Sequence, residues 1–83
     1  MIYVGIDVAK DKHDCFVTNS DGEVLFKPFT ISNNREGFDT LFQRISSVSE
    51  DLTKVKVGLE ATGHYSYNLL GFLLDKGLPT YVI

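Results

Sequence analysis

Two short stretches share one pattern: an apolar residue, a glycine, a second apolar residue and a carboxylate. They are Val4-Gly5-Ile6-Asp7 and Val57-Gly58-Leu59-Glu60. Side chains alternate between the two faces of a strand, so each acid shares a face with its glycine while the middle apolar residue points the other way. Parallel neighbouring strands lie about 4.8 Å apart, which would bring both carboxylates within reach of one divalent cation. If the two stretches are neighbouring parallel strands, the pattern therefore predicts a metal site formed by Asp7 and Glu60.

Each acid alone also has an ordinary explanation. An aspartate at a strand end commonly caps the following turn, and a glutamate before Ala61-Thr62-Gly63 can be a solvated strand terminus. The repeated frame favours function over accident, because glycine leaves room for a ligand to approach the backbone beside the acid.

The composition is that of a small globular domain. The 83 residues are 43% hydrophobic and 23% charged, enough for one domain with a small core. Residues 69–74 are too short a run to cross a bilayer, and no signal-peptide pattern follows Met1, so we expect a cytoplasmic location without membrane association. The single Cys15 excludes an intramolecular disulfide and a cysteine-rich zinc site.

The net charge of −3 argues against an electrostatic clamp for nucleic acid, which requires clustered lysines and arginines. It is compatible with a metal-dependent phosphoryl-transfer centre, because acids attract the cations that then face a phosphate. Strong binding of DNA or RNA is therefore expected from other parts of the protein.

The hydrophobic pattern predicts three strands, a helix, a strand, a helix and a final strand. The expected strands are residues 2–8, 13–19, 23–31, 55–59 and 80–83. Asn33 is expected to cap the first helix with Glu36 in the reciprocal position, and the second helix should run from His64 or Tyr65 to Lys76. Asp21-Gly22 indicates a tight hairpin, and Pro28 places the third strand at a sheet edge or bulge.

Three antiparallel strands followed by right-handed crossovers predict a mixed α/β sheet, ordered 3-2-1-4-5, with helices on its faces. Strands 1 and 4 then become neighbours, and Asp7 and Glu60 reach the end of the sheet where ligands usually bind. No linker or repeat divides the chain, so we expect one domain.

Several stretches resemble one known family. They are Gly5-Ile6-Asp7-Val8-Ala9-Lys10, Asp21-Gly22, Asn33-Asn34-Arg35-Glu36-Gly37-Phe38 and, most specifically, Leu59-Glu60-Ala61-Thr62-Gly63-His64-Tyr65. Together they resemble the N-terminal RuvC-like, ribonuclease-H-like domain of DEDD-type insertion-sequence transposases, relatives of the Piv DNA invertases. The resemblance implies that Asp7 and Glu60 are the first two of four acids that coordinate Mg²⁺ or Mn²⁺. It also implies that the complete protein cleaves and transfers DNA strands, directed by a structured guide-type RNA.

The family also has two further aspartates on a later helix and a distant domain carrying a serine nucleophile. We therefore expect residues 1–83 to be the N-terminal part of one ribonuclease-H-like catalytic domain, ending before the third and fourth acids. Two carboxylates make a weak magnesium site, so this part alone should be inactive. Its apolar end, Tyr81-Val82-Ile83, and an uncovered sheet face predict a homo-oligomer.

Five residues near the acids are candidates for contact with nucleic acid, each with an ordinary alternative: Lys10, Thr62, Gly63, His64 and Tyr65. Lys10 belongs to a charged turn, while Thr62 and Gly63 could cap a helix instead of binding a phosphate. His64 could be a surface group, and Tyr65 could pack in the core instead of stacking on a base. His13 and Asp14 alternate faces, so no chemistry is assigned to them.

Three other functions remain open. A Holliday-junction resolvase uses a similar acid set, and a non-catalytic domain could bind nucleic acid or a partner protein. A phosphotransferase of the actin and sugar-kinase type also has a first strand ending in Gly-x-Asp. Its turn normally wraps phosphate with glycine and Thr or Ser, which Val8-Ala9-Lys10 does not provide.

Overall fold

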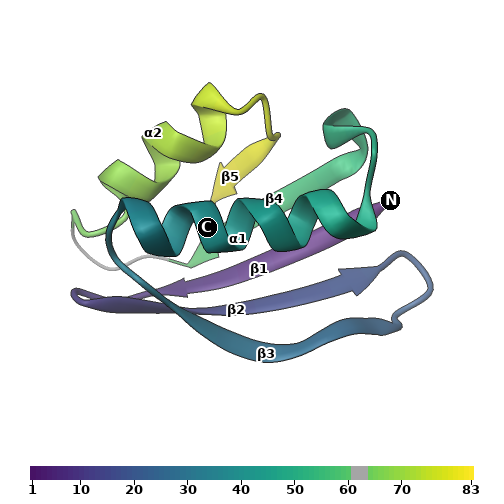
Figure 1. The fold of residues 1–83 in the computed structure, drawn as a ribbon, viewed down its shortest axis with the longest axis horizontal. Coiled ribbons are helices and arrows are strands. Elements are labelled where there is room, and N and C mark those ends of the chain that lie inside the picture. Colours follow the sequence, from purple (N-terminus) through teal and green to yellow (C-terminus); the bar gives the residue numbers. More distant parts are fainter. Residues whose placement is uncertain (61–63) are drawn as a thin grey trace.

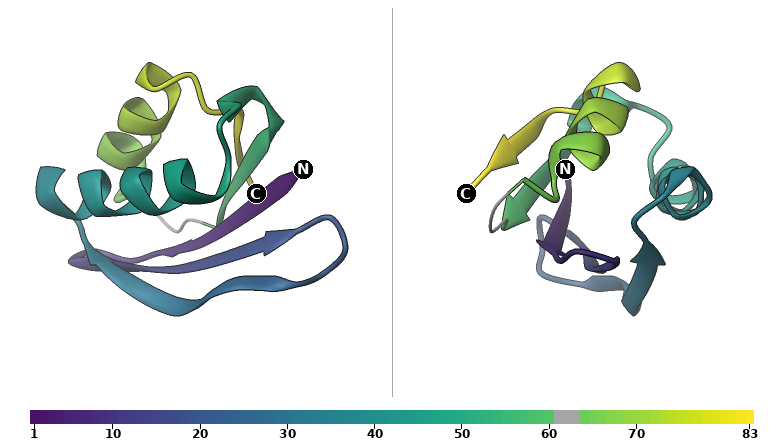
Figure 2. Two further views of the ribbon diagram at one scale, coloured as in Figure 1. Left: turned by 45° about the vertical axis from the view of Figure 1, so that its right-hand side comes forward. Right: turned by 90° about the vertical axis from the view of Figure 1, so that its left-hand side faces the viewer.

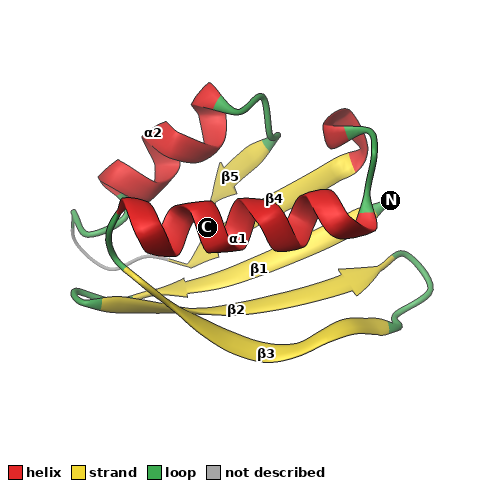
Figure 3. Cartoon of the chain, in the orientation of Figure 1, coloured by secondary structure: helices red, strands yellow, loops and turns green. Residues whose placement is uncertain are grey.

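The computed structural model describes residues 1–60 and 64–83, which form five strands, two α-helices and one 3-10 turn (Figures 1 and 3). In chain order these are β1 (Ile2–Val8), β2 (Lys12–Asn19), β3 (Val24–Ser32), α1 (Arg35–Val48), η1 (Leu52–Lys54), β4 (Val55–Glu60), α2 (Tyr67–Asp75) and β5 (Thr80–Val82). The predicted sequence of strands and helices is confirmed, with boundaries shifted by at most three residues. The short turn η1 was not predicted.

The strands form one mixed sheet in the order β3-β2-β1-β4-β5, as predicted. β1 and β3 run antiparallel to β2, whereas β4 is parallel to β1 and β5 is parallel to β4. The hairpin between β2 and β3 turns at Gly22, whose φ of 82° is readily adopted only by glycine. The crossover through α1 places β4 beside β1 at the centre of the sheet.

Both helices cover the same face of the sheet (Figure 2). The prediction placed helices on the faces without assigning them, and the structure leaves the second face bare. The buried residues form one cluster drawn from the strands and both helices: Val4, Ile6, Val8, Cys15, Val17, Ile31, Phe38, Leu41, Ile45, Val55, Val57, Leu59, Leu69, Leu73 and Leu78. The helices also touch each other, because the rings of Phe38 and Phe72 lie 5.5 Å apart.

The opposite, open face carries exposed aromatic rings. Tyr3 on β1, Phe16 on β2 and Tyr81 on β5 are all about half exposed. With Ile83 they line a shallow hollow of about 450 Å³ whose floor includes Gly5 and Gly58. The alternation of each strand therefore separates a packed core from an uncovered apolar surface.

β3 is an edge strand, as Pro28 predicted. Its pairing with β2 moves from Cys15 opposite Phe29 to Val17 opposite Phe26, so one residue of β2 faces two residues of β3. Pro28 is one of those two residues, and it has no N–H to contribute to the ladder. The predicted bulge is thus found where proline interrupts the hydrogen bonds.

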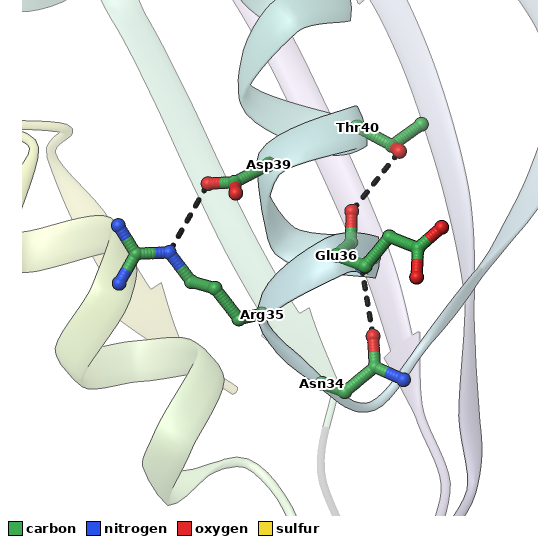
Figure 4. Close-up of polar contacts among 6 residues, drawn as sticks. Asn34, Arg35, Glu36, Asp39 and Thr40 are labelled. Atoms are coloured by element: carbon green, nitrogen blue, oxygen red, sulfur yellow. Dashed lines mark hydrogen bonds and ion pairs between the residues drawn. The ribbon is translucent and has the colours of Figure 1, made fainter.

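The start of α1 differs from the prediction. Asn34, not Asn33, is the cap, and its Oδ1 accepts a hydrogen bond from the Gly37 N–H at 2.9 Å (Figure 4). Asn33 instead donates through Nδ2 to the Lys10 carbonyl at 2.8 Å, tying the helix start to the turn between β1 and β2. Within the described chain Glu36 makes no reciprocal capping bond, and Figure 4 shows its carboxylate directed away from the cap.

α2 begins later than predicted. Residues 64–66 form a turn closed by a hydrogen bond from the Tyr67 N–H to the His64 carbonyl at 3.3 Å. The helix ends at Asp75, one residue before the predicted Lys76, and Gly77 with a φ of 78° reverses the chain before Pro79. Neither helix in the described parts of the chain is long and apolar enough to span a membrane.

Candidate functional site

The two Gly-x-acid stretches lie side by side in matching register. Gly5 pairs with Gly58 and Asp7 pairs with Glu60 across the parallel β1–β4 ladder. Both acids are exposed at the carboxyl ends of their strands, on the open face away from the helices. Residues 53 positions apart in the chain are therefore neighbours at one end of the sheet.

The two glycines leave the surface beside the acids open. A Cβ placed on Gly5 would meet no atom within 4 Å, and one on Gly58 would meet only the Ile83 Cδ1 at 3.4 Å. A hollow of about 130 Å³ lies there, lined by Gly5, Ile6, Asp7, Phe16, Gly58, Glu60 and Ile83. This volume can hold a cation with part of its hydration shell.

The carboxylates have the chemistry of ligands for a hard cation. Within residues 1–60 and 64–83, the one ion pair joins Arg35 to Asp39, so no basic side chain neutralises Asp7 or Glu60. Two like charges at adjacent positions of a sheet repel each other unless a cation lies between them. The described residues contain no group of three or more His, Cys, Asp or Glu side chains that could hold a metal ion.

Asp14 also lies in this region, and no chemistry was predicted for it. It lies directly opposite Asp7 across the antiparallel β1–β2 pair and is exposed on the same face. Its Oδ1 accepts a hydrogen bond from the Thr30 Oγ1 at 2.8 Å. The short turn between β1 and β2 sets this register. Pairing the two strands symmetrically about the Lys10–Asp11 peptide bond would have predicted that Asp14 lies opposite Asp7.

His13 points to the other face, as the alternation predicted. It is fully buried, and its Nδ1 accepts a hydrogen bond from the Ala9 N–H at 3.2 Å. Its ring is stacked with Phe38 of α1 at 6.4 Å between centroids. This histidine belongs to the core and does not reach the acids.

The other candidate residues differ in how they are placed. Tyr65 is half-buried and packs against the core, which agrees with its ordinary alternative. His64 is exposed, with its ring 4.8 Å from that of Tyr65, and the Lys10 side chain extends into solvent from the turn after β1. Thr62 and Gly63 lie outside the described residues.

The thiol of Cys15 has low reactivity. It is fully buried beneath α1, and burial, together with the neighbouring Asp14 carboxylate, raises the pKa of its thiol to about 12. A thiol with so high a pKa stays protonated at neutral pH and is a poor nucleophile.

Comparison with solved structures identifies the fold as ribonuclease-H-like. The whole chain superposes on 65% of Thermus thermophilus RuvC in complex with a Holliday junction substrate, with a TM-score of 0.62 and 13% identity. It also superposes on 63% of another T. thermophilus RuvC structure, with a TM-score of 0.57 and 16% identity. An Aquifex aeolicus PPX-GPPA enzyme gives a TM-score of 0.54 at 16% identity over 36% of its length. The chain thus spans about two thirds of RuvC.

Comparison of sequences is more specific. None of the curated proteins matches the chain. Residues 4–83 match the model of a family described as transposases, the DEDD transposases of IS110 type. The match covers nearly every residue and includes both Gly-x-acid stretches. The chain therefore belongs to the IS110-type DEDD transposase family.

Proposed function

We propose that residues 1–83 supply the first two metal ligands of a transposase that cleaves and transfers DNA strands. Asp7 and Glu60 are these ligands, and the cation is Mg²⁺ or Mn²⁺. The observation that carries the proposal is the pairing of Asp7 with Glu60, exposed on an open face at the ends of adjacent parallel strands. The family match favours a transposase over a Holliday-junction resolvase, because the likeness to RuvC at 13% identity concerns the fold alone.

The protein contributes position and charge. Asp7 projects from the central strand β1 and Glu60 from β4, so the sheet holds the two carboxylates at fixed spacing. They act as ligands and carry no proton in the reaction. A divalent cation, when bound, would polarise the phosphodiester and offset the charge that develops on the leaving oxygen. Gly5 and Gly58 keep the surface low enough for a phosphate to approach.

Two carboxylates are too few for a competent two-metal centre. We propose that the complete protein adds two aspartates from a later helix and a domain with a serine nucleophile. Residues 1–83 are then the N-terminal part of the catalytic domain and are inactive alone. This agrees with a chain that spans 65% of the length of RuvC.

DNA is the proposed substrate, and a structured RNA is the proposed guide. With a net charge of −3, this part of the protein has little electrostatic attraction for either. Lys10 and His64 are the exposed groups near the acids that could contact a phosphate, while most of the binding comes from other parts of the protein. We also propose that the chain self-associates through its open apolar face.

A metal titration of the complete protein tests the site. Asp7→Asn and Glu60→Gln should each weaken Mn²⁺ binding at least tenfold, measured as free Mn²⁺ by electron paramagnetic resonance. Asp21→Asn is the matched control, because Asp21 is an exposed acid in the hairpin between β2 and β3, away from the site. Unchanged affinity in Asp7→Asn and Glu60→Gln would remove both residues from the metal site.

A further inference from the structure

We propose that Asp14 is a positioning residue for the cation bound by Asp7 and Glu60, acting through a metal-bound water. This inference rests on the proposed function. It assigns a role to a residue outside the Gly-x-acid pattern. Asp14 would accept a hydrogen bond from the hydration shell and add negative charge beside the site, without binding the cation directly.

The sheet aligns Asp14 with both ligands. Thr30, Asp14, Asp7 and Glu60 occupy matched positions on β3, β2, β1 and β4, so they form one row across four adjacent strands. Asp7, Asp14 and Glu60 are all exposed, and Asp14 and Glu60 flank Asp7 on its two sides. Asp14 therefore lies one strand away from Asp7 on one side, as Glu60 does on the other.

The row is unfavourable without a cation. Like charges directly opposite each other on neighbouring strands destabilise a sheet. In the described residues no lysine or arginine pairs with Asp14, and the neutral Thr30 hydroxyl satisfies one oxygen without cancelling the charge. A bound cation would relieve the repulsion along the whole row. A purely structural role explains the bond to Thr30 but not the placement of a third negative charge here.

The same geometry favours contact through water. The described residues contain no three acids converging on one point, which argues against direct binding by Asp14 together with both ligands. Its bond to Thr30 holds one oxygen on the side of β3, away from Asp7. The second oxygen remains available for a water, and Mg²⁺ characteristically keeps several waters.

The test is Asp14→Asn in the complete protein, with two measurements. Contact through one bound water would place the carboxylate about 5 Å from the cation. In salt-containing water, one negative charge at about that distance strengthens binding of a divalent cation roughly fivefold, so Mn²⁺ affinity should fall by that factor. The metal-free protein should meanwhile gain about 2–5 °C in Tm, because one like-charge pair is removed. Asp21→Asn removes the same charge far from the row and should leave Mn²⁺ affinity unchanged.

The two measurements separate a positioning role from a structural one. If Asp14→Asn binds Mn²⁺ like the unmodified protein while Asp7→Asn does not bind it, the inference is overturned and the proposed function stands. A lowered metal-free Tm with unchanged affinity would likewise make Asp14 only a partner of Thr30. If Asp7→Asn also binds Mn²⁺ normally, the proposed site itself is wrong, and the role of Asp14 falls with it.

Discussion

Replacing Gly37 with alanine should destabilise the domain, although alanine is the better helix former. Gly37 lies in the first turn of α1, buried where the helix passes over the end of β3. A Cβ at this position would overlap the Ser32 carbonyl oxygen and lie 2.7 Å from the Ser32 nitrogen and 2.9 Å from its carbonyl carbon. These are backbone atoms, so no side-chain rotation can relieve the contact.

The size of the effect follows from two opposed contributions. Helix propensity favours alanine over glycine by about 1 kcal/mol. Overpacking against a rigid neighbour costs about 1–3 kcal/mol, and moving α1 also strains the Asn34 cap, worth about 1 kcal/mol. The net loss is therefore about 2 kcal/mol of unfolding free energy. In a domain of this size that corresponds to a decrease in Tm of about 8–16 °C.

The assay is urea and thermal unfolding followed by circular dichroism, with Gly71→Ala as the matched control. Gly71 lies exposed in the middle of α2, and a Cβ there would meet no atom within 4 Å. Gly71→Ala should therefore stabilise the protein by up to about 1 kcal/mol. If Gly37→Ala is as stable as the unmodified protein, or gains as much as Gly71→Ala, the close contact between α1 and β3 is refuted.

Three further predictions concern chemistry and assembly. The pKa of the Cys15 thiol is about 12 in the folded protein, against a reference value of 9.0 for the unfolded chain. Between pH 9 and 10 the unfolded chain loses this proton while the folded protein keeps it, so the free energy of unfolding should fall by about 1 kcal/mol. Urea titrations of Cys15→Ala should lack this fall, and an equal fall in both proteins would contradict the raised pKa of Cys15. Residues 1–83 alone should not cleave DNA with Mg²⁺ in a gel assay, and cleavage abolished by Asp7→Ala would disprove the need for further acids. Light scattering should show a dimer or larger species that Phe16→Thr reduces, whereas a monodisperse monomer at high concentration would rule out self-association.

The strand order and the pairing of Asp7 with Glu60 were predictable because each depends on strong local signals. Period-two alternation defines the strands, Asp21-Gly22 and Pro28 define a hairpin and an edge, and chirality then places β4 beside β1. The register of the acids follows from the repeated Gly-x-acid frame. These features hardly depend on contacts between distant side chains.

The cap of α1 could not be predicted in the same way. Asn33 and Asn34 are chemically identical candidates, and the choice is made by a hydrogen bond from Asn33 to the Lys10 carbonyl, 23 residues earlier. The late start of α2 similarly reflects the turn at residues 64–66 that precedes it. The alignment of Asp14 with Asp7 was accessible in principle, but it required the register of the β1–β2 turn.

The two edges of the sheet differ in their ability to accept another strand. On β3, Pro28 and two shifts of register interrupt the regular spacing of hydrogen-bonding groups. On β5, the short run Thr80–Val82 continues the parallel ladder without interruption. Lengthening of the sheet, whether by the same polypeptide or by a partner, is thus directed outward from β5. Such growth would leave Asp7 and Glu60 in the interior of a wider sheet, where the spacing of their backbones is held from both sides.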